Sequence, residues 1–98
     1  MYHAPMYYAL LYDYVPDIVE RRGPLRPAHL ALGEESRERG ELVLAGAWTD
    51  PVDGALLVFN VADRETVERF VEHDPYVKNG LVTAYRIRSW NVVIGGER

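Results

Sequence analysis

One histidine stands in a sequence context that could support proton transfer. His29 lies in the segment Arg26-Pro27-Ala28-His29-Leu30, where a proline near the start is typical of the first turn of a helix. Unpaired backbone N–H groups at a helix start attract anions and disfavour an imidazolium, so an imidazole there can stay neutral and accept a proton. His29 is therefore a candidate general base, although a lone histidine on a helix is more often structural.

Basic, aromatic and small residues provide candidates for holding a substrate. Arg26 could bind an anionic or phenolate oxygen, or it could pair with Glu20 or Asp17 at the surface. Gly46 removes a side chain from a predicted strand, which lets a helix, a backbone or a ligand approach closely. Three tyrosines could line the same pocket, although aromatic residues on a sheet more often pack in a core or an interface; they are Tyr8, Tyr12 and Tyr76.

Length and composition exclude several classes of protein. The chain of 98 residues fits a single domain over 1–98, with a core from about 6 to 94 and a short extension over residues 1–5. It has no cysteine, which excludes disulfides, thiol catalysis and thiolate metal sites. The net charge of -4 argues against a nucleic-acid partner. Without a membrane-spanning run or a signal-peptide pattern, we expect no membrane partner and a cytoplasmic location.

The sequence predicts neither a metal site nor a cofactor. Its three histidines show no HxH or HxxxH spacing, so they provide no pair of metal ligands. The pair Gly95-Gly96 has no helix after it and cannot form a phosphate-binding loop. The partner that we expect at a site around His29 is a small molecule.

Hydrophobic patterning and turn residues predict the elements that must position these side chains. Strands are predicted over residues 6–14, 41–48, 55–61 and 81–94, long helices over 27–39 and 64–73, and a helical turn over 17–22. Asp63 can cap the second long helix, and Asp74-Pro75 ends it. Right-handed crossovers turn this order into a ferredoxin-like βαββαβ fold of the α+β class, an antiparallel sheet with both helices on one face.

The first three predicted strands carry apolar residues on both faces. Two helices on one side of the sheet leave the other side uncovered, and nothing else in the chain can cover it. The simplest remedy is a second copy packed sheet to sheet, which gives a two-fold symmetric homodimer through the open sheet face.

Four short motifs occur in an order and spacing that resemble the YciI-like family. They are RPAHL, GELVLAGAW, HDPYVKNGL and SWNVV, and the resemblance spans residues 6 to 93. It implies a dimeric α/β barrel of ferredoxin-like topology. The best-understood activity of that family is cofactor-free dehydrochlorination of a chlorinated hydroxyquinol by a histidine–aspartate pair, and the matching positions are His29 and Asp74. The chain departs from the family at Gly46-Ala47, where Gly-Pro is common, and in the short loop 49–54, which leaves the substrate class open.

The predicted topology would bring these two residues together. His29 begins one helix and Asp74 ends the other, and adjacent antiparallel helices on one sheet place such ends side by side. A carboxylate bonded to one ring nitrogen would fix the tautomer and leave the other nitrogen as a proton acceptor. The alternative is that Asp74 only caps a helix end while His29 bonds to nearby backbone.

These observations favour a small cofactor-independent enzyme. It would carry out proton transfer or dehydrochlorination-like lyase chemistry on a compact aromatic or enolisable substrate, with His29 as general acid or base and Asp74 as its orienting partner. Two alternatives stay open. One is a non-catalytic dimeric module that binds a small ligand. The other is a relationship to the cofactor-free quinol-forming monooxygenases, which share the architecture but lack the RPAHL and DPY pairing.

Overall fold

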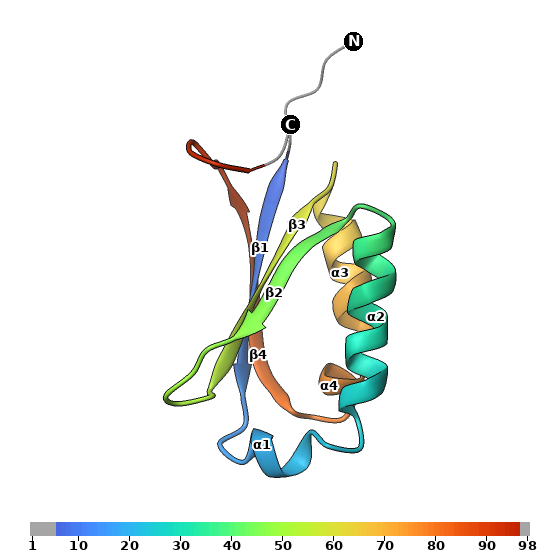
Figure 1. The fold of residues 1–98 in the computed structure, drawn as a ribbon, viewed down its shortest axis with the longest axis vertical. Coiled ribbons are helices and arrows are strands. Elements are labelled where there is room, and N and C mark those ends of the chain that lie inside the picture. Colours follow the sequence, from blue (N-terminus) through green and yellow to red (C-terminus); the bar gives the residue numbers. More distant parts are fainter. Residues whose placement is uncertain (1–5, 97–98) are drawn as a thin grey trace.

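An antiparallel sheet with its long helices on one face forms the framework of the protein (Figure 1). A computed structural model describes residues 6–96, so the expected extension over residues 1–5 lies outside the described part. The strand order is β2-β3-β1-β4, and each neighbouring pair is antiparallel, which confirms the predicted ferredoxin-like α+β fold. The elements in chain order are β1 (Tyr7–Tyr14), α1 (Ile18–Arg21), α2 (Arg26–Glu38), β2 (Leu42–Ala47), β3 (Gly54–Asn60), α3 (Arg64–His73), α4 (Pro75–Lys78) and β4 (Val82–Trp90).

Local signals explain where the long helices begin and end. Asp63, in an extended conformation, accepts hydrogen bonds from the backbone N–H and the hydroxyl of Thr66 at 3.0 and 2.8 Å, which caps α3 as predicted. These hydrogen bonds, with that of the Thr66 side chain as the larger effect, lower the pKa of the Asp63 carboxyl. α2 carries Pro27 in its first turn and ends before Gly40, whose φ of 82° suits a glycine after a helix.

The end of the last predicted strand is wrong, and the sequence did not predict one short helix. The last strand stops at Trp90 rather than Ile94, because Trp90 already pairs with Tyr7, the first residue of the neighbouring strand β1. Asp74-Pro75 ends α3 as predicted. Asp74 also accepts a hydrogen bond from the backbone N–H of Tyr76 and thereby caps an additional short helix, α4. Pro75 occupies the first position of α4, where its missing N–H costs nothing.

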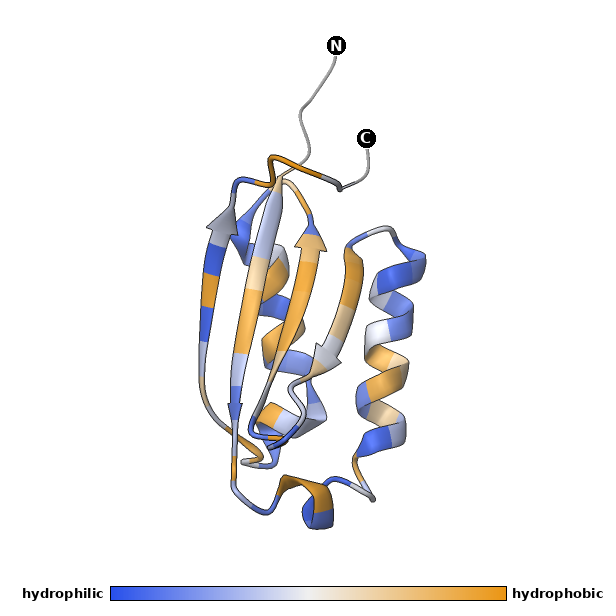
Figure 2. Cartoon of the chain, turned by 60° about the vertical axis from the view of Figure 1, so that its left-hand side comes forward, coloured by the Kyte–Doolittle hydropathy of each residue, from blue (hydrophilic) through white to orange (hydrophobic). Residues whose placement is uncertain are grey.

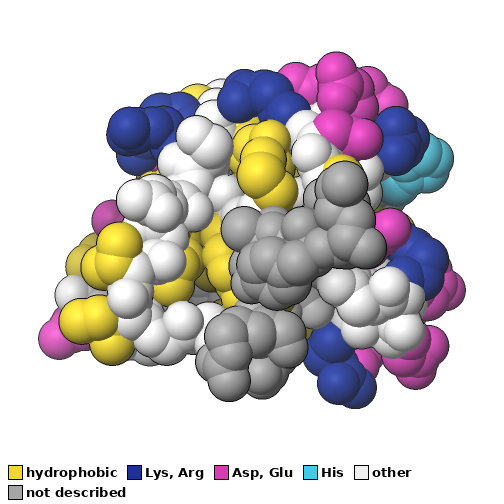
Figure 3. Space-filling model, turned by 90° about the horizontal axis from the view of Figure 1, so that it is seen from above, with side chains coloured by type: hydrophobic (Ala, Val, Ile, Leu, Met, Phe, Trp, Pro, Cys, Tyr) yellow, Lys and Arg dark blue, Asp and Glu magenta, His cyan; other side chains and the backbone are white. Residues whose placement is uncertain are grey.

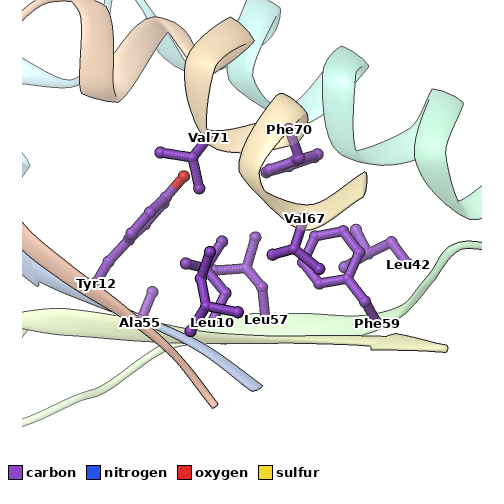
Figure 4. Packing of buried hydrophobic residues seen from close by; sticks show 10 residues of the cluster. Leu10, Tyr12, Leu42, Ala55, Leu57, Phe59, Val67, Phe70 and Val71 are labelled. Atoms are coloured by element: carbon purple, nitrogen blue, oxygen red, sulfur yellow. The ribbon is translucent and has the colours of Figure 1, made fainter. Parts of the chain in front are cut away.

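The core lies between the sheet and α3 (Figure 4). α3 turns Val67, Phe70 and Val71 toward the sheet, and the rings of Phe70 and Phe59 meet edge to face with centroids 5.2 Å apart. α2 contributes less, because Ser36 is its only fully buried residue. The other buried members of this cluster come from the sheet and are Leu10, Tyr12, Leu42, Ala55, Leu57, Phe59 and Ile87.

The central strands β1 and β3 contain hydrophobic stretches, as Figure 2 shows, and their apolar residues fall on both faces of the sheet. The pairing register places Ala9 opposite Val58 and Leu11 opposite Leu56, out of phase with the core residue Leu10. Hydrophobic side chains are also exposed at the end of the molecule seen in Figure 3, and the segment after β4 contains two of the most exposed ones, Val93 and Ile94, at 80% and 90%.

Candidate functional site

A fully buried carboxylate joins three elements at one end of the helix layer. Asp74, between α3 and α4, is 0% exposed. Its Oδ2 accepts a hydrogen bond of 2.7 Å from the hydroxyl of Tyr12 on β1. Its Oδ1 lies 2.8 Å from Nδ1 of His29 on α2 and 3.0 Å from the backbone nitrogen of Tyr76 on α4. Because an ionised carboxylate can only accept hydrogen bonds, the proton is assigned to Nδ1 of His29.

The imidazole of His29 is held on its edge and on one face. Its ring stacks on that of Tyr76 with centroids 3.8 Å apart and planes 5° from parallel. The backbone N–H of His29 bonds to the carbonyl of Leu25, which fixes the residue in the first turn of α2. Only 15% of the side chain is exposed, and Nε2 makes no hydrogen bond within the part of the chain that the structure describes. Nε2 is therefore the ring nitrogen left for an external partner.

His29 and Tyr76 line a small open cavity between α2 and the sheet. Its volume is about 180 Å³, and its sheet side is formed by small and apolar residues of β2 and β3. α2 buries only Ser36 completely, and the short side chains of Ala45 and Ala47 leave space beneath its first turn. The lining residues are Tyr14, Arg22, Arg26, His29, Leu30, Ala45, Gly46, Ala47, Ala55, Leu57 and Tyr76.

Burial raises the pKa values of three tyrosines in this region above the ordinary phenol value, which itself lies well above neutral pH. It raises the pKa of Tyr14 to about 12, and the nearby hydroxyl of Tyr76 and the carboxylate of Asp74 act in the same direction. Burial also raises the pKa of Tyr76, whereas the charges of Arg22 and Arg26 oppose the shift at both residues. The pKa of Tyr12 is raised far above its usual value by burial and then by Asp74. All three phenols can therefore donate hydrogen bonds at neutral pH.

The structure brings most of the candidate residues to one place. His29 and Asp74 are in hydrogen-bonding contact, and Arg26, Tyr76 and Gly46 line the cavity beside them. The alternative in which His29 bonds to nearby backbone is not observed, although Asp74 does cap α4.

Arg26 is not paired with Asp17 or Glu20. Asp17 instead lies 3.6 Å from Arg21, and Arg26 forms no ion pair within residues 6–96.

The expectation that Tyr8 and Tyr12 line the pocket is not met. Tyr12 is 1% exposed, and its hydroxyl donates a hydrogen bond to Asp74. It therefore holds the carboxylate in place and does not line the cavity. Figure 4 shows its oxygen pointing away from the sheet, near Val71. Tyr8 packs against the core and lies four residues from Tyr12 along β1, about 13 Å away at the strand's rise per residue.

Sequence reasoning missed two cavity residues, Tyr14 and Arg22. Tyr14 continues the alternation that puts Tyr12 on the helix side of β1, so the period of two could have found it. Arg22 precedes Arg26 by one helical turn, and the backbone N–H of Arg26 bonds to the Arg22 carbonyl at 2.8 Å. That spacing of four was a usable signal for two arginines on one side of a turn.

Two other classes of site are absent from residues 6–96. No group of three or more histidine, cysteine, aspartate or glutamate side chains in this part of the chain could hold a metal ion. None of its helices has the length and apolar composition needed to cross a membrane.

The fold and the cavity define a small α+β domain of ferredoxin-like topology with a histidine–carboxylate pair on the helix side of its sheet. The family model of the YCII-related domain matches residues 6–91, and the chain belongs to this family. The resemblance that the four motifs indicated is thereby confirmed.

Several solved structures share the fold. The 5-chloro-2-hydroxyhydroquinone dehydrochlorinase from Burkholderia phenoliruptrix, in complex with 2,5-dihydroxybenzoquinone, is 23% identical with a TM-score of 0.75, over 88% of this chain and 94% of that one. A Pseudomonas aeruginosa protein is 13% identical with a TM-score of 0.63, over 94% and 97%. A nipsnap family protein with unknown function from Agrobacterium tumefaciens is 16% identical with a TM-score of 0.53, over 92% and 89%. At these identities the likeness shows the fold alone, and no curated protein matches the sequence.

The support that Tyr12 gives to Asp74 can be measured as stability. In Tyr12→Phe the Oδ2 atom of a buried carboxylate loses its hydrogen-bond donor, which we expect to lower the free energy of unfolding by about 1–3 kcal/mol. Urea unfolding of the variant and the parent measures this. Tyr8→Phe is the matched control, because the Tyr8 hydroxyl makes no hydrogen bond within the described residues. Equal losses in both variants would show that the contact with Asp74 is not the cause.

The raised pKa of Tyr14 predicts a stability loss in alkali. An unfolded tyrosine releases its proton near pH 10, whereas folded Tyr14 holds its proton to about 12, so the unfolded state binds fewer protons between these values. Stability must therefore fall as the pH rises from about 10 to about 12. In Tyr14→Phe this decline should be shallower, as urea unfolding at a series of pH values would show. Parallel declines in the variant and the parent would contradict the assignment.

Proposed function

We propose that this protein is a small cofactor-independent enzyme that transfers a proton to or from a compact aromatic or enolisable substrate. His29 is the general base or acid, and Asp74 is its orienting partner. The observation that supports this most is the contact of 2.8 Å between His29 Nδ1 and a buried carboxylate, beside an open cavity. A carboxylate in this position fixes the tautomer and stabilises the imidazolium that forms when Nε2 accepts a proton.

The surroundings of His29 suit this chemistry. The stack on Tyr76 and the bond to Asp74 restrict the ring before any substrate binds, so little ordering is needed during the reaction. The apolar surface from Ala45, Ala55 and Leu57 can accept the flat face of an unsaturated ring. A positioned base of this kind typically contributes about 10²–10⁴-fold to the rate of a proton-transfer step.

The shared fold supports a lyase reaction class in particular. By its name, the Burkholderia structural neighbour removes hydrogen chloride from a chlorinated hydroxyhydroquinone. In a reaction of this type, the substrate first takes a keto form in which the ring carbon that bears chlorine also bears hydrogen and is saturated. A base then removes a hydroxyl proton, and the released electron pair moves through the adjoining ring double bond and expels chloride. In the chain described here, Nε2 of His29 would take that proton, and the cavity beside it would hold the ring.

The first test is loss of turnover. We expect His29→Gln and Asp74→Asn to slow proton exchange or dehalogenation by about 10²–10⁴-fold in a screen over phenolic and chlorinated phenolic substrates. His73→Gln is the matched control, because His73 is exposed and its Nδ1 contacts only the Arg69 carbonyl. Turnover that survives His29→Gln would remove His29 from the mechanism. Ligand binding without turnover in the parent protein would favour the non-catalytic binding module instead.

The open face of the sheet supports a homodimer as the working unit. No helix within residues 6–96 covers this face, and it carries a shallow hollow. Its lining is apolar at Ala9, Leu11, Leu56 and Trp90, with Arg88 and Ser89 on the edge strand β4. Packing two such faces together would remove apolar surface from water, and each Å² buried contributes about 25 cal/mol of favourable free energy to association.

A charge on that face tests the dimer. We expect the parent chain to sediment as a dimer at micromolar concentration, and we expect Leu56→Lys to shift it to monomer, because the new charge would be buried without a partner. Val19→Lys is the control, since Val19 is 53% exposed on α1, away from the sheet. A parent chain that sediments as a stable monomer would refute the homodimer.

A further inference from the structure

Two arginines without acidic partners line the same cavity as His29. Arg22 caps the C-terminus of α1 and Arg26 begins α2, and both line the cavity from one turn of the chain. The turn is fixed, because the Arg22 carbonyl accepts backbone hydrogen bonds from Leu25 at 2.9 Å and from Arg26 at 2.8 Å.

The other arginines of the helices and their caps are occupied. Arg21, Arg37, Arg39 and Arg64 each lie within 4.0 Å of a carboxylate, and Arg69 donates a hydrogen bond of 3.2 Å to the Thr66 hydroxyl. Arg22 and Arg26 have neither kind of side-chain partner within residues 6–96. In a chain with a net charge of -4, two uncompensated guanidinium groups beside one small cavity form a local positive site. Their effect on the pKa values of Tyr14 and Tyr76 shows that both charges act on the cavity.

The charge balance of the proposed reaction indicates what this site is for. When His29 accepts a proton, its imidazolium and the Asp74 carboxylate offset each other, and two positive charges from Arg22 and Arg26 remain. A neutral substrate that loses one proton supplies a single negative charge. A substrate that already carries one anionic group, and becomes an enolate or phenolate, supplies two.

We infer that Arg22 and Arg26 bind a carboxylate on the substrate, so that the substrate class is a small unsaturated carboxylic acid with an acidic O–H or C–H group. This inference rests on the proposed function of the same cavity. Guanidinium groups match carboxylates by paired, charge-assisted hydrogen bonds. The cavity of about 180 Å³ is below the usual range of roughly 300–1,000 Å³ for ligand pockets, which suits a compact acid.

Equilibrium binding tests the inference without any need for turnover. The probes are 4-hydroxybenzoate and its uncharged amide, 4-hydroxybenzamide, with affinities measured by NMR titration of the parent protein. We expect the carboxylate to bind at least about tenfold more tightly than the amide, as charge-assisted hydrogen bonds would give. Arg22→Gln and Arg26→Gln should each weaken binding of the carboxylate by about tenfold and leave binding of the amide unchanged.

Two controls separate this inference from the proposed function. Arg21→Gln changes an arginine of the same segment that is paired with Asp17 and does not line the cavity, so the preference for the carboxylate should persist. His29→Gln should keep the preference while abolishing turnover. Equal affinities for the two probes, no binding of either at millimolar concentration, or a preference that survives both cavity arginine substitutions would overturn the inference. A carboxylate preference in a protein without turnover would support the inference and refute the proposed function.

Discussion

The buried carboxylate of Asp74 is the constraint on which the site depends. An ionised group removed from water is costly unless its acceptor positions are filled, and here the three partners come from β1, α2 and α4. Each of these elements must therefore hold its position for the carboxylate to be tolerated. The orientation of His29 and the docking of α4 are consequences of the same set of hydrogen bonds, so the site cannot be loosened without a cost to the fold.

The two long helices differ in what they contact: α3 packs in the core, whereas α2 lines the cavity. α3 presents Val67, Phe70 and Val71 to the sheet and forms the core with it, whereas α2 buries only Ser36 completely. A tightly packed α2 would close the space above β2, and larger side chains than Ala45 and Ala47 would fill it from below. The weak apolar stripe of α2 is thus the feature that leaves a cavity beside His29.

The features that could be predicted from the sequence are those set by local patterns or by the order of the elements. The order of elements, the bounds of α3 and its Asp63 cap follow from periodicity and local capping. The meeting of His29 and Asp74 follows from topology, because antiparallel helices on one sheet bring those ends together. α4 could not be found by periodicity, since four residues are too few, and its existence depends on the side chain of Asp74.

The same limit explains the tyrosines. Alternation along β1 places Tyr8, Tyr12 and Tyr14 on one face, but only tertiary packing decides which of them reaches the cavity. The hydroxyl of Tyr12 donates its hydrogen bond to Asp74. Tyr14, two residues further along β1, has its ring centroid 6.0 Å from that of Tyr76 and lines the cavity. The alternation of side chains along a strand assigns each residue to a face of the sheet, but it does not determine how deeply that residue is buried.

The chemical character of the cavity follows from these placements. Tyr14 and Tyr76 present phenol O–H donors to the cavity and Arg22 and Arg26 present guanidinium N–H donors, while Nε2 of His29 is the ring nitrogen left to accept a proton. A ligand that satisfies such a site presents acceptor oxygens to the donors and one acidic hydrogen to His29. Desolvation in a small cavity strengthens each of these contacts. Selectivity therefore arises from the ratio of donors to acceptors as much as from the size of the cavity.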